Sequence, residues 1–306
     1  MTKKMKILLL EPICCEAIIA LRSKFELFVE ILPNKKRLLE IIEDKDIVIL
    51  KSRIKLDKEV ILAAKHLKLV VMAGIGLDHI CLEELKKREI AWFNIPDLSA
   101  RGVAELALGL TLSLARKICL ADSLLRNHEY QPWKRPELMG CNLQYRIFGI
   151  VGYGKIGKEM ASVAKCFGMN VQVYVRDSEN KTFEEDIRPV TFQTLLKTSD
   201  IISLHLPLTT ETRELFSKPE FEQMQETAFL INTSRGEIVN EKDLYYALKS
   251  KIIAGAALDV FEQKTPYDPL FELDNIVVTP HIGAMTQETQ EQIGLQIVKK
   301  IFEFFK

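Results

Sequence analysis

The chain has 306 residues, enough for two domains, and 47% of them are hydrophobic, which is ample for two cores. The 42 basic and 42 acidic residues balance, so the composition gives no sign of a nucleic-acid partner. The apolar runs are strand-sized, far below the roughly 20 residues that a membrane span needs, and no signal-peptide pattern opens the sequence. Six cysteines form neither a C-x-x-C pair nor a zinc spacing. We therefore expect a cytoplasmic protein with reduced thiols, no bound metal and no membrane contact.

Short β-branched runs alternate with amphipathic stretches, a pattern typical of parallel sheets covered by helices. The first part predicts a small doubly wound unit that ends near Pro96, with strands at 6–10, 47–50, 69–72 and 91–93. A long helix follows from about 99 to 117; it is apolar on most sides, which predicts that it lies buried between two domains. A second series then predicts strands at 147–151, 171–175, 201–204, 228–231, 255–258 and 276–278. Six such strands make a full dinucleotide-binding sheet, and a last helix at 287–305 has Thr286 as its expected N-cap.

A glycine-rich segment, Gly152-Tyr-Gly154-Lys-Ile-Gly157, lies between the predicted strand 147–151 and a helix predicted at 158–167. In that position the G-x-G-x-x-G spacing is a strong indication of a dinucleotide site. The first glycine permits a tight turn, the second lets the backbone approach a pyrophosphate, and the third lets helix and strand pack closely. The N-terminus of the helix adds amide donors and the positive end of its dipole.

The strand after the glycine loop bears on the choice between NAD and NADP. NAD-specific proteins end this strand in an acid that binds the ribose hydroxyls, but here the position holds Val175. Arg176 follows and suits a 2'-phosphate. Asp177, two residues late, either reaches the ribose or pairs with Arg176, and an arginine that is merely exposed in a loop is an equal alternative. We expect NADP or NAD as the cofactor, with NADP favoured.

Several segments together resemble one protein family. They are Ala73-Gly-Ile-Gly-Leu-Asp78, Val103-Ala-Glu105, Asp200-Ile-Ile-Ser-Leu-His-Leu-Pro-Leu-Thr209, Asn232-Thr-Ser-Arg-Gly-Glu-Ile-Val-Asn240, Leu258-Asp-Val-Phe261 and Pro280-His-Ile-Gly-Ala284. In order and spacing, over nearly all of the chain, the sequence resembles the D-2-hydroxyacid dehydrogenases. It is most similar to the 3-phosphoglycerate dehydrogenases that lack a C-terminal regulatory domain.

The resemblance implies roles for individual residues. Arg235 would hold the substrate carboxylate and keto oxygen, since its planar guanidinium matches two oxygens. His281 would give a proton to the oxygen during reduction and remove it during oxidation. Asp259 would orient the nicotinamide carboxamide. The residues expected to contact the cofactor are Gly152, Gly154, Lys155, Ile156, Gly157, Val175, Arg176, Asp177, His205, Leu206, Pro207, Thr212, Thr233, Ser234, Asp259, Gly283 and Ala284.

The substrate is expected to contact two segments of the first unit. The resemblance implies that the backbone amides of Ile75 and Gly76, in the loop that begins at Gly74, bind its carboxylate. Lys51, where the family usually has arginine, forms a basic strand end with Arg53 and Lys55. That strand end suits a phosphorylated or dicarboxylic substrate, and a solvated strand edge is an equal alternative.

The family pattern breaks at one position. Family members place a glutamate five residues after the aspartate of the Asp-Val-Phe strand, where it hydrogen-bonds the catalytic histidine and raises its pKa. Here that position is Lys264, followed by Thr265. An ammonium ~4 Å from the imidazolium would oppose its charge by about 4 kcal/mol at a near-surface dielectric, so His281 would be neutral at neutral pH.

Four interpretations of this break remain open. Glu262 replaces the missing acid through an altered loop; Lys264 points away; Lys264 recognises a substrate phosphate or carboxylate; or catalysis is lost. The third interpretation would favour oxidation of the alcohol, because a neutral histidine is the form that acts as a base.

The resemblance implies an α/β fold of two Rossmann-like doubly wound parallel-sheet domains with the active site in the cleft between them. Residues 1–98 and 282–306 would form the substrate-binding domain, and residues 99–281 the dinucleotide-binding domain. We expect an oxidoreductase that moves a hydride between NAD(P) and a small D-2-hydroxy or 2-keto acid. This acid is either a phosphorylated one, like 3-phosphoglycerate, or one of the two unphosphorylated acids glyoxylate and hydroxypyruvate. The alternative is a nucleotide-sensing binding protein of the same fold, as in the C-terminal-binding-protein corepressors. We also expect a homodimer formed mainly by the cofactor domains, because the helix at 104–114 carries more apolar surface than two-layer packing buries.

Overall fold

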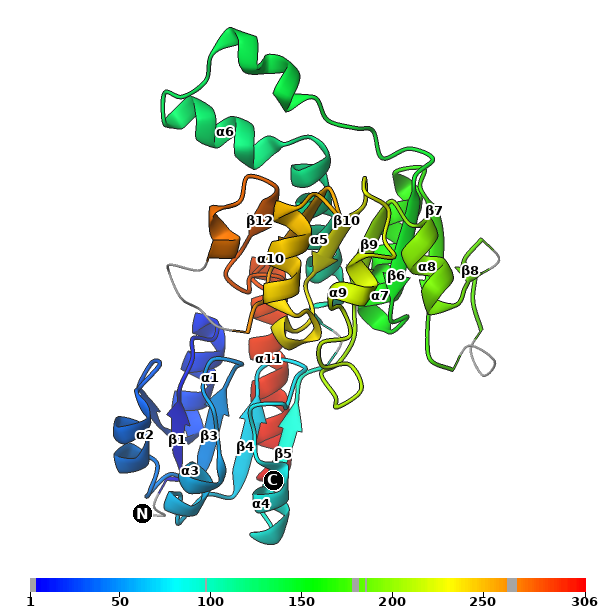
Figure 1. Cartoon of the computed structure of the whole chain (residues 1–306). Helices are drawn as coiled ribbons and strands as arrows, with labels where there is room; N and C mark the ends of the chain where they lie inside the picture. Colours follow the sequence, from blue (N-terminus) through cyan, green and yellow to red (C-terminus); the bar gives the residue numbers. More distant parts are fainter. Residues whose placement is uncertain (1–3, 97, 178–181, 185, 263–268) are drawn as a thin grey trace. The chain divides into compact units, whose positions relative to one another are not determined.

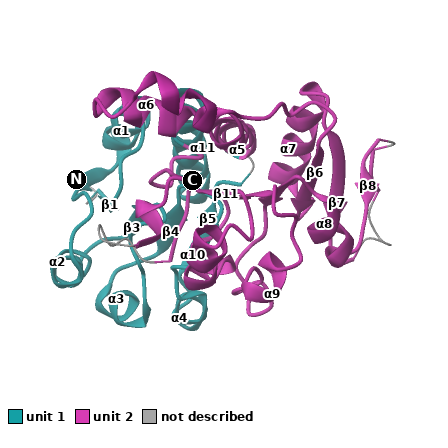
Figure 2. Ribbon diagram, turned by 45° about the horizontal axis from the view of Figure 1, so that its top comes forward, with its two compact units in different colours: residues 1–99, 285–306 teal, residues 100–284 magenta. Residues whose placement is uncertain are grey.

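The computed structural model describes residues 4–96, 98–177, 182–184, 186–262 and 269–306. The chain divides into two compact units, coloured separately in Figure 2. Unit 1 consists of residues Met1–Ser99 and Met285–Lys306, and unit 2 of residues Ala100–Ala284. The substrate-binding and dinucleotide-binding roles of the two parts stay predictions at this point.

Unit 1 has a parallel sheet whose strands follow the order β2-β1-β3-β4-β5 among the described residues. The strands are β1 (Lys6–Leu9), β2 (Glu26–Val29), β3 (Ile47–Leu50), β4 (Leu69–Met72) and β5 (Ala91–Asn94). The helices are α1 (Cys15–Lys24), α2 (Lys35–Ile41), α3 (Lys58–Ala63), α4 (Leu82–Lys87) and α11 (Gln287–Phe304). Because the chain leaves β1 toward β2 on one side and returns to β3 on the other, the winding direction changes between β1 and β3.

Unit 2 has a second parallel sheet, with the order β12-β11-β10-β9-β6-β7-β8 among the described residues. The strands are β6 (Ile147–Val151), β7 (Asn170–Tyr174), β8 (Arg188–Pro189), β9 (Ile201–Leu204), β10 (Phe229–Asn232), β11 (Gly255–Leu258) and β12 (Ile276–Val278). The helices are α5 (Ala100–Ala115), α6 (Ile118–Arg126), α7 (Lys155–Cys166), α8 (Phe192–Thr198), α9 (Lys218–Phe221) and α10 (Glu241–Lys249), and the 3-10 helices are η1 (Pro132–Leu138), η2 (Gly236–Ile238) and η3 (Pro269–Glu272). Figure 1 shows both sheets and their helices. The winding direction of this sheet changes between β6 and β9, so the predicted α/β fold with two Rossmann-like sheets is confirmed.

Alternate residues of each strand enter the cores on opposite faces of the sheets. In unit 1, Ile47 and Ile49 pack toward α1 and α11, whereas Val48 and Leu50 pack toward α2, α3 and α4. Unit 2 follows the same rule, with α5 and α7 on one face and α8, α9 and α10 on the other. The central strands β3 and β4 are therefore apolar and buried along their whole length, as central parallel strands are.

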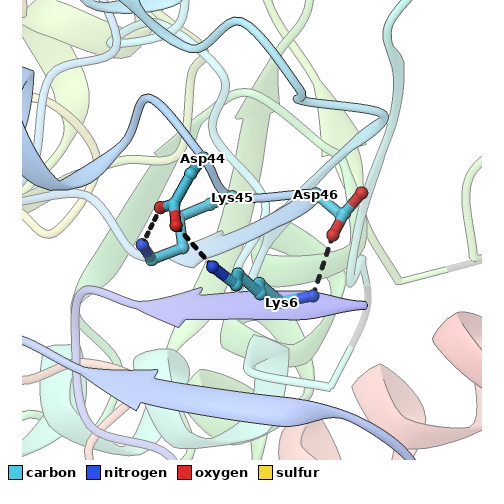
Figure 3. Close-up of polar contacts among 4 residues, drawn as sticks. All are labelled: Lys6, Asp44, Lys45 and Asp46. Atoms are coloured by element: carbon cyan, nitrogen blue, oxygen red, sulfur yellow. Dashed lines mark hydrogen bonds and ion pairs between the residues drawn. The ribbon is translucent and has the colours of Figure 1, made fainter. Parts of the chain in front are cut away.

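Figure 3 shows a group of charges at the amino end of β1. The backbone N–H of Lys6 donates to Asp46 Oδ2 at 2.9 Å, and the ammonium of Lys6 lies 2.5 Å from Asp44. Lys45 also pairs with Asp44, and its buried ammonium lies 4.4 Å from the centre of the Phe28 ring. The ammonium groups of Lys45 and Lys6 lower the pKa of Asp44 to about 2. The contacts of Lys6 with Asp44 and Asp46 join β1 to the segment that leads into β3.

The structure adds two strands to those predicted from the sequence, and it moves the start of one predicted helix. β2 and β8 were not predicted, because β2 alternates little in burial and β8 has two residues, which leaves no pattern to detect. α7 begins at Lys155, three residues before the predicted start, with Gly154 as its N-cap. The predicted cap of the last helix is confirmed, since the Thr286 hydroxyl accepts a hydrogen bond from the N–H of Thr289.

The apolar surface of unit 2 is also distributed differently from the prediction. In α5, Leu110 and Leu114 are buried, and Leu106, Leu108 and Leu112 pack partly against the core of unit 2. Several large apolar side chains are instead exposed on α6 and on the segment around η1, and neither of these helices buries a residue. The surplus apolar surface expected on the long helix is therefore on the segment that follows it.

Among the described residues, no helix combines the length and apolar character that crossing a membrane would require. All six cysteines have free thiols.

Candidate functional site

The first glycine of the loop, at the end of β6, packs closely against the backbone that follows β9. Gly152 has a φ of +97°, and a Cβ at this position would lie 2.4 Å from the carbonyl oxygen of His205. The N–H of Gly152 donates to the carbonyl of Tyr174 at 2.9 Å. Only glycine fits such a backbone conformation at such a short approach.

The other two glycines have different surroundings. A Cβ on Gly157 would lie 2.2 Å from the carbonyl oxygen of Gly152, so the first turn of α7 packs directly on the loop. Around Gly154, in contrast, no described heavy atom lies within 4 Å of where its Cβ would be. The backbone before α7 therefore borders an open space, and the α7 N-terminus adds amide donors to it. This arrangement fits the pyrophosphate of a dinucleotide.

Two polar atoms at the carboxyl end of the unit 2 sheet support the same conclusion. Among the described residues, the buried Nδ1 of His205 and the buried hydroxyl of Thr233 have no hydrogen-bond partner. The other ring nitrogen of His205 bonds to the Ser203 hydroxyl at 2.9 Å, and burial lowers the pKa of His205 to about 4, so the ring is neutral at pH 7. Unpartnered buried polar groups are rare in folded proteins, and a polar ligand along this edge would satisfy both.

The residues predicted to bind the ribose lie after β7. Val175 is buried, and Arg176 and Asp177 are exposed. A hollow of about 820 Å³ lies beside them and is also lined by Arg188 from β8. The pKa of the nearby Glu211 is lowered, mainly by the Thr209 hydroxyl and in smaller part by the charge of Arg176. Two arginines therefore border the hollow next to Val175.

Other predicted cofactor residues shape the loop after β9. The Thr212 hydroxyl donates to the Pro207 carbonyl at 2.7 Å and accepts the N–H of Thr209 at 2.7 Å. His205 follows β9 directly, and its N–H donates to the Val151 carbonyl at 2.8 Å. Thr212 therefore holds the conformation of this loop.

Arg235 lies in the loop at the carboxyl end of β10. The side chain of Asn232 shapes that loop: its Oδ1 accepts hydrogen bonds from the N–H and hydroxyl of Ser234, and its Nδ2 donates to the carbonyl of Arg235. Arg235 itself is half-buried and donates to the Ser234 carbonyl at 2.7 Å. A Cβ on Gly236 would lie 2.2 Å from backbone of Phe261, so the turn packs tightly on the segment after β11. Asn232 is a residue that the sequence analysis named only within a motif.

Asp259 fixes the segment that contains His281. Its side chain is 1% exposed. Oδ1 accepts hydrogen bonds from the Thr279 hydroxyl at 2.6 Å and the Ile282 N–H at 2.8 Å, and Oδ2 accepts the Gly283 N–H at 2.9 Å. The N–H of His281 donates to the Asp259 carbonyl at 2.8 Å.

His281 has a φ of +60°, in the left-handed region that non-glycine residues rarely adopt. The hydrogen bonds to Asp259 on both sides of it hold that conformation, which is a common feature of functional positions. Because β10, β11 and β12 are neighbours in the sheet, Arg235, Asp259 and His281 all follow the carboxyl ends of adjacent strands.

Of the two residues proposed around the break in the family pattern, the structure describes only Glu262. Glu262 is exposed, its carboxylate lies 3.7 Å from the Arg213 guanidinium, and its N–H donates to Glu241. Lys264 lies outside the described residues.

The predicted substrate residues of unit 1 follow β3 and β4, which are adjacent strands. Lys51 is half-buried and Arg53 is exposed. The loop at Gly74 to Gly76 is attached to the end of β5: the Asn94 side chain donates to the Ile75 carbonyl at 2.8 Å, and the Ile95 N–H donates to the Gly74 carbonyl at 3.0 Å. Sequence reasoning missed Asn94, because a single amide at a strand end has no distinguishing pattern.

A parallel sheet that changes winding direction at a glycine loop, with polar residues at the carboxyl ends of the next strands, is typical of dinucleotide-dependent dehydrogenases. The model of one family, described as D-isomer specific 2-hydroxyacid dehydrogenase, NAD binding domain, matches residues 108–283. The chain therefore belongs to the D-isomer specific 2-hydroxyacid dehydrogenase family, and it is an oxidoreductase that works with a nicotinamide cofactor.

Three relatives illustrate the similarity. The hydroxypyruvate reductase of Thermotoga maritima is 39% identical over 274 residues, which are 88% of each chain. The D-3-phosphoglycerate dehydrogenase of Archaeoglobus fulgidus is 38% identical over 99% of this chain, which spans 58% of that relative's length. The crystal structure of D-lactate dehydrogenase from Aquifex aeolicus, complexed with NAD and lactic acid, matches with a TM-score of 0.85 at 27% identity and covers 98% of this chain and 95% of that one.

Replacing Asp259 with Asn tests its hold on the His281 segment. An amide keeps one acceptor oxygen, but its NH₂ group would face the N–H of Gly283, so two donors would oppose each other. We expect the free energy of unfolding to fall by about 1–3 kcal/mol and kcat to fall more than tenfold. Urea unfolding and steady-state kinetics measure the two effects. Thr279→Val, which removes one donor only, is the control with a smaller loss, and an Asp259→Asn variant that matches the parent protein would contradict the assignment.

Proposed function

We propose that Arg235 and His281 carry out the interconversion of a D-2-hydroxy acid and its 2-keto acid in this protein. The supporting observation is that both residues follow the carboxyl ends of neighbouring parallel strands, with Asp259 holding the His281 segment between them. A half-buried arginine and a histidine in a constrained backbone conformation suit substrate binding and proton transfer.

Each residue has a defined task in this proposal. The guanidinium of Arg235 binds the carboxylate through two parallel hydrogen bonds and polarises the keto oxygen. The imidazolium of His281 gives its proton to that oxygen as it becomes a hydroxyl, and neutral His281 takes the proton back in the oxidation. When bound, the nicotinamide supplies or accepts the hydride at the carbon that carries this oxygen. Gly152, Gly154 and the N-terminus of α7 would hold the pyrophosphate.

We further propose that the substrate carries a hydroxyl or phosphate group on the carbon next to the keto group. Lys51 and Arg53 lie at the end of β3, next to the Gly74 loop at the end of β4, so a carboxylate on that loop would place its distal group toward the two basic residues. Hydroxypyruvate and its phosphate ester fit this description, and one relative is a hydroxypyruvate reductase.

The substrate proposal is tested with purified protein, both cofactors, and glyoxylate, hydroxypyruvate and phosphohydroxypyruvate. We expect turnover followed by nicotinamide absorbance, with a lower KM for the two substrates that have a distal group. His281→Asn should abolish turnover while cofactor still binds, and Arg235→Lys should lower kcat/KM roughly 100-fold, since it loses the two-pronged charge-assisted contact. Arg213→Lys, at an exposed arginine of the same unit, is the matched control. Absence of turnover on every 2-keto acid would instead favour a nucleotide-sensing binding protein.

The preference between the two cofactors is a separate proposal. Val175 lacks the carboxylate that would repel a 2'-phosphate, and Arg176 and Arg188 border the hollow beside it. We propose that NADP(H) binds at least as tightly as NAD(H), because a phosphate gains charge-assisted hydrogen bonds from guanidinium groups.

Val175→Asp should shift the preference toward NAD(H) by about 1–3 kcal/mol, because the new carboxylate repels a 2'-phosphate and accepts hydrogen bonds from ribose hydroxyls. Fluorescence titration with both reduced cofactors gives the two Kd values. Val171→Thr, earlier on β7, should leave their ratio unchanged. Strong NAD(H) selectivity in the unaltered protein would mean that Asp177 recognises the ribose.

We propose that the protein is a homodimer whose interface includes α6 and the segment around η1. Figure 1 traces this part of the chain as an excursion from the seven-stranded sheet of unit 2. Leu125 is 60% exposed, Trp133 74% and Met139 77%. These three side chains border one hollow, and a cluster of exposed large apolar side chains marks a protein–protein interface; a two-fold axis is the commonest way for identical chains to cover it.

Light scattering at micromolar concentration should return twice the chain mass of 35.0 kDa. The double substitution Leu125→Glu and Trp133→Glu should lower the mass toward that of one chain, because it places charges where apolar surface would be buried. Ile19→Glu is the matched control, since Ile19 is 70% exposed but belongs to unit 1. A single-chain mass for the unaltered protein would rule the dimer out.

A further inference from the structure

A buried carboxylate lies where the winding direction of the unit 1 sheet changes. Glu11 follows β1 after one intervening residue, and it is 4% exposed. At this point of the sheet, called its switch point, β1 pairs with β3. Lys51 follows the end of β3 and begins the loop that we proposed to contact the substrate. In doubly wound sheets, ligands bind outside the carboxyl ends of the strands at this point.

The carboxylate of Glu11 holds the backbone of that loop. Its Oε1 accepts the N–H of Lys51 at 2.8 Å and the N–H of Arg53 at 3.1 Å. Two amides that are two residues apart can converge on one oxygen only if the chain between them turns back on itself. The oxygen therefore determines the shape of the loop, and burial of the carboxylate means that water cannot easily take its place.

The ammonium of Lys51 is oriented by Gln290 and lies near the charge of Glu11. Its Nζ donates a hydrogen bond to Oε1 of Gln290, which lies on α11 of the same unit. Burial lowers the pKa of Lys51, and the negative charge of Glu11 opposes this effect. Burial also raises the pKa of Glu11, and the N–H groups of Arg53 and Lys51 oppose that shift. A lysine with one fixed hydrogen bond and a buried carboxylate beside it loses much of its rotational freedom.

We infer that Glu11 is a positioning residue for substrate recognition: by accepting both loop amides, it fixes the direction in which Lys51 and Arg53 meet the distal group of the substrate. The inference rests on the proposed function of these two basic residues. The preference for a substrate with a distal group then depends on the shape of the loop as well as on the charges of Lys51 and Arg53. A substrate without a distal group does not use the loop and is indifferent to Glu11.

The test compares hydroxypyruvate, which has a distal hydroxyl, with glyoxylate, which has none. Glu11→Ala removes both acceptor contacts and should raise KM for hydroxypyruvate about tenfold, with KM for glyoxylate and both kcat values within about twofold of the parent. Glu11→Gln keeps an oxygen that can accept both amides, so KM for hydroxypyruvate should stay within about twofold. Glu11→Asp has a shorter side chain that cannot reach both amides, so its KM for hydroxypyruvate should lie between those of Glu11→Ala and Glu11→Gln. This variant keeps the test possible if Glu11→Ala does not fold.

Asp46→Ala is the matched control. Asp46 also accepts a backbone N–H in unit 1, but at the amino end of β1 (Figure 3), so it should leave the ratio of the two KM values unchanged. If the Glu11 variants lower kcat/KM equally for both substrates, or leave the KM ratio unchanged, Glu11 only stabilises the fold and the inference is wrong.

Lys51→Ala, measured alongside, separates this failure from a failure of the proposed function. If Lys51→Ala raises KM for hydroxypyruvate and the Glu11 variants do not, only the positioning role is overturned. If Lys51→Ala leaves that KM unchanged, the loop does not contact the substrate, and both proposals are overturned together.

Discussion

The buried side chain of Asp259 is the interaction on which the structure of the proposed His281 site depends. It accepts one hydrogen bond from a hydroxyl and two from backbone N–H groups, all within the segment from Thr279 to Gly283. A carboxyl group at 1% exposure is stable only because each of its oxygens accepts hydrogen bonds. Since His281 lies inside the segment, the same bonds hold its backbone in the left-handed conformation and determine where its imidazole can point. The resemblance assigns Asp259 to the nicotinamide, and the structure adds this second task.

Unit 1 also uses a buried acid in this way, in its case where the winding direction of its sheet changes. Glu11 in unit 1 and Asp259 in unit 2 are both buried acids beyond the carboxyl ends of parallel strands, and both accept backbone N–H groups from the end of a neighbouring strand. Parallel sheets leave the last N–H groups of their strands without a partner in the ladder. A buried carboxylate satisfies several of them at once and gives the adjoining loop one conformation.

The glycine loop depends on the absence of side chains. At Gly152 and Gly157 a Cβ would meet backbone oxygen, whereas at Gly154 it would enter open space. The first and third glycines are therefore required by packing within unit 2, and the second leaves room for a ligand. This division of roles within one motif explains why the spacing of the three glycines is diagnostic.

The sequence by itself determined the fold class and the identity of the residues at the carboxyl ends of the strands. Apolar runs of strand length, the spacing of the glycine loop, and the motifs around Arg235 and His281 are local patterns, and local patterns can be read in one dimension. It did not predict the edge strands β2 and β8, whose residues are half-exposed or too few to show a period. The apolar surface of α6 was also missed, because exposure depends on what packs nearby.

Only the tertiary structure decided which groups the buried acids hold. Glu11 and Lys51 are 40 residues apart in sequence, and Asp259 and Gly283 are 24 apart. Their hydrogen bonds exist because parallel pairing brings the ends of different strands to one edge of a sheet, and no spacing along the chain records that contact.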